Sequence, residues 1–132
     1  MKILVFGSRE WIFDGIIYRV LSKLPKDTIL IHGAARGADT IAGRIGEQLG
    51  FDVRPYPVSK EEWDRLGGAA GPQRNARMIK EEHPDINGLL IDKGFGFSTE
   101  YPTAKKNKGT HNMSEQLWRA KIRFEIFFPQ AA

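Results

Sequence analysis

Short apolar runs alternate along the chain with longer segments in which apolar residues recur every three or four positions. The apolar runs are too brief for helices and end at glycine or polar residues, which is typical of buried strands. Five such strands are expected, over residues 2–6, 28–32, 51–56, 86–91 and 123–128. The pattern therefore predicts a sheet whose strands are separated by helices or loops.

The longer segments predict amphipathic helices. In the first of them Ile12, Ile16 and Val20 share one face, and Pro25 ends the pattern. Helices are expected over residues 12–24, 38–49, 72–82 and 110–120, with Gly50 as the C-terminal cap of the second. The segment 57–71 is expected to be a loop with one helical turn at 59–66, and 92–108 a long polar loop.

Strands that alternate with helices predict a parallel sheet with helices on both faces. We therefore expect an α/β protein with a five-stranded parallel sheet of order 3-2-1-4-5, built as a single domain over residues 1–132. In open sheets of this kind the ligand binds beyond the carboxyl ends of the strands, where the strand order reverses. That place lies between the first and fourth strands.

A glycine-rich turn, HGAARGAD at residues 32–39, follows the second strand. Gly33 and Gly37 let the backbone approach a ligand without a side chain in the way, and the N–H groups of the following helix favour an anion such as phosphate. Arg36 adds a guanidinium that can bind two phosphate oxygens. A tight connection in which Asp39 caps the helix explains the same residues equally well.

Similar side chains occur at three other turns. They are Gly7, Ser8 and Arg9 after the first strand, Arg74 and Asn75 in the helix that Pro72 begins, and Gly109 and Thr110 at the start of the last helix. Basic and amide groups at the positive end of a helix favour an anion. Helix capping and ordinary surface charge are the simpler explanations of each turn taken alone.

Aromatic and histidine residues near these turns allow two interpretations each. Trp11 either stacks on a base or, as is more usual for such a residue, packs on the first helix. Trp63 either closes over a ligand or anchors its loop. His111 can act as a general acid or base, but a lone histidine without a visible partner is more often structural.

The segment 93–108 combines Phe95, Phe97 and Tyr101 with several lysines. Aromatic and basic side chains together bind single-stranded nucleic acid, because bases stack on the rings and phosphates meet the lysines. A lid over the site is the other interpretation.

The composition narrows the class of protein. The chain has 132 residues, of which 41% are hydrophobic and 27% charged, without a long apolar span or a signal pattern at its start, so we expect a cytoplasmic protein, in the host cytoplasm if phage-encoded, with no membrane contact. It has no cysteine, and its three histidines lack ligand spacing, so neither a thiol nucleophile nor a metal site is expected. The net charge of +4 suits an anionic partner, either nucleotide or nucleic acid.

Four motifs occur in a characteristic order: GSREW at 7–11, HGAARGAD at 32–39, AGPQRNARM at 70–78 and GTHNM at 109–113. Over nearly all of residues 1–128 the chain resembles the YspA/YpsA-related SLOG family, which is common in bacteria and their phages. The resemblance implies a Rossmann-like three-layer fold and a pocket for a nucleotide or sugar phosphate, with no other cofactor. It implies as pocket residues Gly7, Ser8, Arg9, Gly33, Arg36, Gly37, Asp39, Arg74, Asn75, Gly109 and Thr110.

The last motif departs from that of the phosphoribohydrolases in the wider SLOG superfamily. Theirs has the form G-G-x-G-T-x-x-E, and its glutamate assists cleavage of the N-glycosidic bond, whereas Met113 stands at that position here. A thioether cannot transfer a proton. Asp39 and Glu100 are the remaining candidates for a catalytic carboxylate. Ala34 also replaces a glycine that the family resemblance leads us to expect.

Three functions are compatible with these residues. The first is binding of an ADP-ribose, NAD-type or nucleoside-phosphate ligand by a sensor, scavenger or carrier. The second is hydrolysis or transfer at an N-glycosidic bond, and the third is binding of single-stranded DNA, as by the related DNA-uptake protein DprA. Because relatives often dimerise, a homodimer or higher homo-oligomer is also expected.

Overall fold

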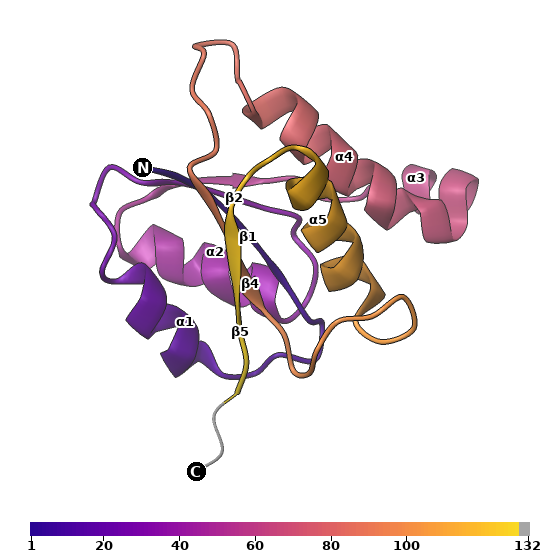
Figure 1. Ribbon diagram of the computed structural model, residues 1–132, viewed down its shortest axis with the longest axis horizontal. Helices are drawn as coiled ribbons and strands as arrows, with labels where there is room; N and C mark the ends of the chain where they lie inside the picture. Colours follow the sequence, from indigo (N-terminus) through magenta and orange to yellow (C-terminus); the bar gives the residue numbers. More distant parts are fainter. Residues whose placement is uncertain (130–132) are drawn as a thin grey trace.

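Five parallel strands form the central sheet of the computed structural model, which describes residues 1–129. Their order is β3-β2-β1-β4-β5, so the order reverses between β1 and β4. The strands are β1 (Lys2–Gly7), β2 (Ile29–His32), β3 (Asp52–Pro55), β4 (Lys93–Phe97) and β5 (Phe124–Phe127). The α/β class and the strand order expected from the sequence are confirmed (Figure 1).

Helices cover both faces of the sheet, as Figure 1 shows. On one face α1 (Asp14–Leu21) packs against α2 (Ala38–Gln48), and on the other α4 (Ala70–Glu82) packs against α5 (Lys108–Arg119). A short helix, α3 (Lys60–Leu66), and the 3-10 turn η1 (Gly67–Ala69) lead into α4. Within residues 1–129 no helix has both the length and the apolar character that crossing a membrane requires.

Two helix boundaries have a clear local cause. The Ser59 hydroxyl accepts a hydrogen bond from the Glu62 N–H at 3.1 Å, and the Ser59 N–H donates to the Glu62 carboxylate at 3.2 Å, which completes a capping box at the start of α3. After α2, Gly50 has a φ of +84°, a left-handed conformation that commonly follows a helix. With seven residues, α3 is longer than the single turn expected.

The fourth strand is Lys93–Phe97, not the segment 86–91 that its apolar residues favoured. The Asp85 carboxylate accepts hydrogen bonds from the N–H groups of Asn87 and Leu89, so the segment after it turns, and the Ile86 side chain is 99% exposed. In β4 two glycines alternate with two phenylalanines, a pattern with a weak apolar signal. The expected long loop therefore begins only after β4, and Phe95 and Phe97 are buried core residues.

The sheet separates two apolar cores. Phe95, Phe97 and Trp11 belong to the core beneath α1 and α2, whereas Met78 and Met113 belong to the core beneath α4 and α5. The Trp11 side chain is 1% exposed, and its indole N–H donates to the Phe13 carbonyl at 2.9 Å. Packing, the more usual of the two interpretations, therefore accounts for Trp11.

Candidate functional site

The candidate site lies at the carboxyl edge of the sheet, where the turns after β1, β2 and β4 meet. The Ser8 N–H donates to the Phe97 carbonyl at 2.8 Å, and the Ala38 N–H donates to the Ser8 carbonyl at 3.1 Å. The turn after β1 is thereby bonded both to the end of β4 and to the start of α2. The sequence placed these turns side by side from the strand order alone.

Gly7 and Ser8 are engaged by the protein itself. A Cβ on Gly7 would lie 2.7 Å from the Ala38 Cβ and would also collide with the Phe97 carbonyl oxygen, so glycine is required for packing. The Ser8 side chain is buried, and its hydroxyl accepts from the Thr99 N–H at 3.0 Å and bonds to the Ser98 hydroxyl at 3.3 Å. Both residues fix the position of the turn.

Asp39 holds the turn after β2. Its Oδ2 accepts hydrogen bonds from the N–H groups of Gly33 at 3.0 Å and Ala35 at 3.4 Å. The side chain thus binds the loop rather than capping the free N–H groups of α2. Burial raises the Asp39 pKa to about 6, although the charge of Arg74 and the two N–H groups oppose this shift.

Arg74 connects this turn to the opposite face of the sheet. Its Nη1 donates to the Gly33 carbonyl and its Nε donates to the Asn75 Oδ1 at 3.0 Å. Asn75 is buried and donates in turn to the Asn112 side chain of α5 at 3.1 Å. Burial lowers the Arg74 pKa, and the Asp39 charge only partly offsets this effect.

His32 and Ala34 shape the same turn. The His32 Nδ1 accepts from the Ala34 N–H at 2.9 Å, and burial, together with the charge of Arg74, lowers its pKa to about 4. The ring is therefore neutral near pH 7, with its proton on Nε2. Ala34 has a φ of +56°, the left-handed conformation that glycine would adopt more readily at this position.

Thr110 and Gly109 begin α5 beside this network. Thr110 is buried, and its hydroxyl oxygen has no hydrogen-bond partner among residues 1–129. Gly109 is exposed, with open space where a Cβ would lie. A buried hydroxyl without a partner is costly in a folded protein and indicates an unfilled polar position.

The exposed arginines extend the site outward. The Arg9 guanidinium lies 5.9 Å from the centre of the Trp63 ring, while Arg36 forms an ion pair with Glu10 at 3.2 Å. Together with Arg44 and Gly37, Arg9 and Arg36 line an open cavity of about 460 Å³ between α1 and the start of α2. Arg9 also acts electrostatically on both Asp39 and Arg74, so it links this cavity to the buried network.

The residues considered for catalysis differ in their burial and in their partners. Glu100 is exposed and lies 3.5 Å from Lys106 in an ion pair. Met113 is 1% exposed and packs in the core, so its position faces away from solvent. His111 lies 3.4 Å from Glu115 on α5. Asp39 is the carboxylate that the structure buries within the hydrogen-bond network of the candidate site.

Two residues of the network were not predicted. No role was expected for His32, although its place at the last position of a buried strand was a usable signal. Asn112 had no local signal, because its role depends on the packing of α4 against α5. No group of three or more His, Asp or Glu side chains in residues 1–129 is arranged to hold a metal ion.

Comparison with known proteins identifies a family, a phage protein and a solved structure that this chain is similar to. The model of the family described as YspA, cpYpsA-related SLOG family matches residues 1–63, which include both glycine turns. Gene 61 protein of Mycobacterium phage D29 is 34% identical over 87 residues, which cover 60% of this chain and 68% of that protein.

The third match is a solved structure, DNA processing protein A (DprA) from Streptococcus pneumoniae. It superposes with a TM-score of 0.71 at 17% identity and covers 98% of this chain. The chain spans 50% of the length of that DprA chain. The likeness confirms the Rossmann-like fold.

Proposed function

Because the chain belongs to the YspA, cpYpsA-related SLOG family, we propose that the carboxyl edge of its sheet binds the phosphate of a nucleotide or nucleotide-derived ligand. Such a protein would act as a sensor, scavenger or carrier of the ligand. ADP-ribose, NAD-type molecules and nucleoside phosphates are the ligand classes that we infer.

The observation that carries the proposal is the pairing of Arg74 and Arg9 around a single buried carboxylate. Each arginine is among the groups that shift the Asp39 pKa, and the charge of Arg9 also acts on Arg74. Arg9, Arg74 and Arg77 act at this edge against the carboxylates of Asp39 and Glu62, which leaves an excess of positive charge. An anion would balance that charge, and a guanidinium meets a phosphate through two parallel hydrogen bonds.

Arg74 has donors to spare for such an anion. Its Nε and Nη1 donate to Asn75 and Gly33, while its Nη2 has no protein acceptor in the part of the chain that the structure describes. Asn75 donates to Asn112, which places Arg74 near the first turns of α5. Gly109, with open space where a Cβ would lie, and Thr110, whose hydroxyl has no partner in residues 1–129, belong to the first turn of α5. We therefore infer a phosphate position between Arg74 and the start of α5.

The Gly33 turn supports this position rather than receiving the phosphate itself. Its N–H groups are occupied by Asp39, which takes the place that an external anion would take in an empty turn. In this arrangement Asp39 fixes the Gly33 carbonyl, which in turn orients Arg74.

Calorimetric titration with ADP-ribose, NAD and nucleoside monophosphates tests the proposal. At least one ligand is expected to bind, and Arg74→Gln is expected to weaken it roughly 10- to 100-fold, as for a lost charge-assisted hydrogen bond. Arg19→Gln, on the exposed last turn of α1, is the matched control and should leave the affinity unchanged. Absence of heat with every ligand would refute the proposal.

One observation favours a second candidate function, cleavage of an N-glycosidic bond. A carboxyl group with a pKa of about 6 can hold or release a proton near neutral pH, and Asp39 is such a group beside the inferred phosphate position. Chromatography after long incubation with nucleoside phosphates would reveal released base. Release that persists unchanged in Asp39→Asn would remove Asp39 from that reaction.

A further inference from the structure

We propose that a second pocket, on the side of α5 that faces β5, binds a nucleobase. This cavity has a volume of about 440 Å³ and is lined by residues of the loop after β4, of α5 and of β5. That volume is within the range of small-molecule sites in proteins. The base can be presented by a free nucleotide or nucleoside, or by single-stranded nucleic acid.

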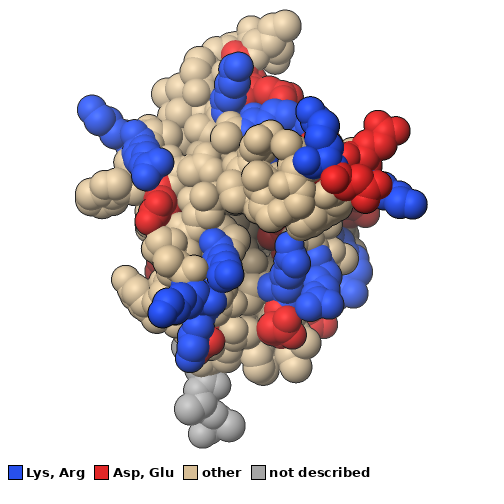
Figure 2. Space-filling model, turned by 90° about the vertical axis from the view of Figure 1, so that its right-hand side faces the viewer, with Lys and Arg blue, Asp and Glu red and all other residues tan. Residues whose placement is uncertain are grey.

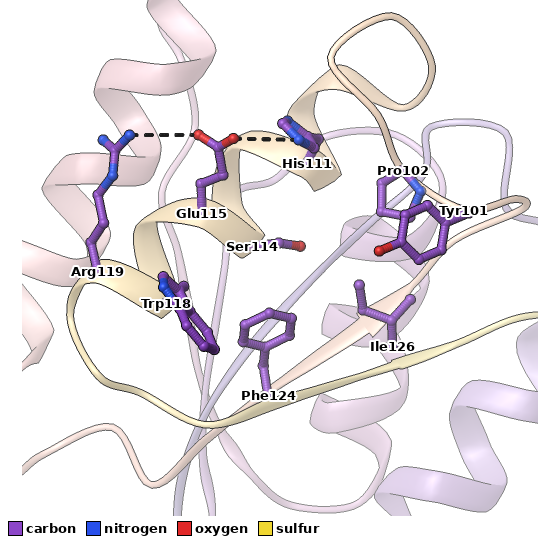
Figure 3. Close-up of a pocket in the computed structure, with 9 residues that line it drawn as sticks. All are labelled: Tyr101, Pro102, His111, Ser114, Glu115, Trp118, Arg119, Phe124 and Ile126. Carbon is purple, nitrogen blue, oxygen red and sulfur yellow. Dashed lines mark ion pairs between the residues drawn. The ribbon is translucent and has the colours of Figure 1, made fainter.

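Two aromatic side chains flank the pocket, as Figure 3 shows. Tyr101 and Trp118 stand on opposite sides, with Phe124 and Ile126 below them and Ser114 between them. An apolar surface beside exposed aromatic rings suits a flat aromatic group, because stacking on a ring buries one of its faces.

The rings of Trp118 and Tyr101 are mostly exposed to solvent, which is unusual for large aromatic side chains. Trp118 is 78% exposed and Tyr101 is 75% exposed, whereas Trp11 in the core is 1% exposed. Large aromatic rings at a pocket mouth that remain in water contribute little to folding, since burial of their surface is what would stabilise the protein. Stacking with a ligand would bury that surface.

The upper side of the pocket is polar and matches the edge of a base. The Glu115 carboxylate lies 3.4 Å from the His111 Nε2 and 3.7 Å from the Arg119 Nη2, the two ion pairs that the dashed lines in Figure 3 mark. A carboxylate there can accept from the ring N–H or amino group of a base. Arg119 is largely exposed at the rim, where a phosphate attached to the base would meet it.

The pocket is separate from the site at the carboxyl edge. His111, Ser114 and Trp118 follow one another at helical spacing on one face of α5. Asn112 and Gln116 occupy another face, which contacts α4 through Asn75 and Pro72. A ligand group in the pocket therefore contacts a different side of α5 from a phosphate at Arg74.

The charge distribution on the face that Figure 2 shows is discontinuous. Figure 2 shows the face that lies on the right of Figure 1, and the basic side chains there form separate groups around an uncharged centre, with acidic side chains beside several of them. Short contacts with one or a few nucleotides suit such a face better than a long strand held by a continuous basic groove.

Nuclear magnetic resonance of the Trp118 indole N–H, assigned by its loss in Trp118→Phe, gives a readout specific to this pocket. Adenosine and guanosine, which carry a base without phosphate, are expected to shift this signal in a saturable way. Trp118→Ala and Tyr101→Ala are each expected to weaken binding about 5- to 100-fold, as for a lost base-stacking contact. Tyr18→Ala, an exposed aromatic on α1, is the matched control and should change nothing.

The arms of the experiment separate the two sources of the base. If oligonucleotides bind more tightly than mononucleotides and lose affinity steeply with salt, the base comes from single-stranded nucleic acid. If mononucleotides bind as tightly, it comes from the free nucleotide. The proposal is overturned if neither nucleosides nor oligonucleotides shift the Trp118 signal, or if both alanine variants bind like the unchanged protein. Because nucleosides lack phosphate, failure here is distinguishable from failure at Arg74.

Discussion

At the amino end of the sheet Lys2 is buried among carboxylates that neutralise it, whereas at the carboxyl end Asp39 is buried beside arginines that exceed it in charge. The Lys2 Nζ lies 3.0 Å from the Glu82 carboxylate and 2.8 Å from that of Asp85, and it also donates to the Glu82 carbonyl at 2.7 Å. Arg54 and Tyr56 donate to the same Glu82 carboxylate, at 2.8 and 2.6 Å. Each charge of this cluster has a partner within the chain.

The pKa values of the carboxyl groups express this difference. Burial opposes ionisation of Glu82, but the hydrogen bonds from Tyr56 and Lys2 and the charges of Lys2 and Arg54 outweigh it, so its pKa is lowered. The hydrogen bond from Lys2 is the largest of the effects that lower the Asp85 pKa to about 2. Asp39, in contrast, has a raised pKa of about 6. Ionised groups satisfied internally contribute to stability, and groups left partly unsatisfied are available to a ligand.

The largest expected effect comes from breaking the cluster at the amino end. Lys2→Met removes the buried cation from two carboxylates, beside which only the less buried Arg54 remains, and is expected to lower the free energy of unfolding by about 3–5 kcal/mol. Lys93→Met is the matched control, because Lys93 pairs with Glu125 at 3.0 Å at a more exposed position and should cost at most about 1 kcal/mol. Urea denaturation at neutral pH measures both, and equal costs would show that the cluster is not a buried ion network.

The next effect is a gain in folding stability at the carboxyl end of the sheet, opposite in sign to the loss expected from Lys2→Met. Burial raises the Asp39 pKa from 3.8 to about 6, so folding favours the protonated form, and stability is lost as the pH rises through 6. Asp39→Asn removes this loss and is expected to stabilise the protein at pH 7.5 by up to about 3 kcal/mol. At pH 3.5, where Asp39 is protonated in both states, the substitution should have little effect.

Thermal and urea unfolding of Asp39→Asn across this pH range provide the measurement. Asp14→Asn, at an exposed position in the first turn of α1, serves as the control and should lack the pH-dependent gain. A destabilised Asp39→Asn protein at pH 7.5 would mean that the ionised carboxylate is satisfied internally, as it is at the other end.

The smallest effects come from removing one hydroxyl at each end. Tyr56→Phe deletes a donor to the Glu82 carboxylate and is expected to cost about 1–2 kcal/mol. Thr110→Val deletes a hydroxyl that has no partner in residues 1–129, so stability should be unchanged or slightly higher, while nucleotide binding weakens. Calorimetric unfolding and ligand titration separate the two variants. A Thr110→Val protein that is less stable yet binds normally would assign that hydroxyl a structural role.

Much of the fold could be predicted from the sequence because local patterns specify it. Gly50 marks the end of α2, apolar runs mark four of the five strands, and the alternation of strands with helices implies the parallel sheet, whereas α1 ends at Leu21, earlier than Pro25 suggested. The predicted position of the fourth strand was wrong because Gly94 and Gly96 give little apolar signal. Glycine is needed there because the Leu117 and Phe6 side chains pack directly on these two positions. That requirement exists only in the packed structure.

The candidate site was predictable in location but not in its internal bonding. The glycine turns lie together because parallel strands end at one edge, which the sequence implies. That Asp39 fills the Gly33 turn, or that Lys2 meets Glu82 some 80 positions away, depends on contacts between segments remote in the chain. The partners of Arg74 and Thr110 were equally beyond reach, because they depend on how closely α4 and α5 approach the sheet.

The glycines of β4 let neighbouring side chains, one of them from α5, pack directly on the backbone of this strand. A methyl group on Gly94 would meet the Leu117 side chain of α5 at 2.8 Å, and one on Gly96 would meet the Phe6 ring at 2.7 Å. Because Gly94 has no side chain, Leu117 of α5 packs directly on the backbone of β4, and no side chain lies between them that could adjust its conformation. A displacement of this helix would therefore move Thr110 and Trp118 together, because both belong to α5.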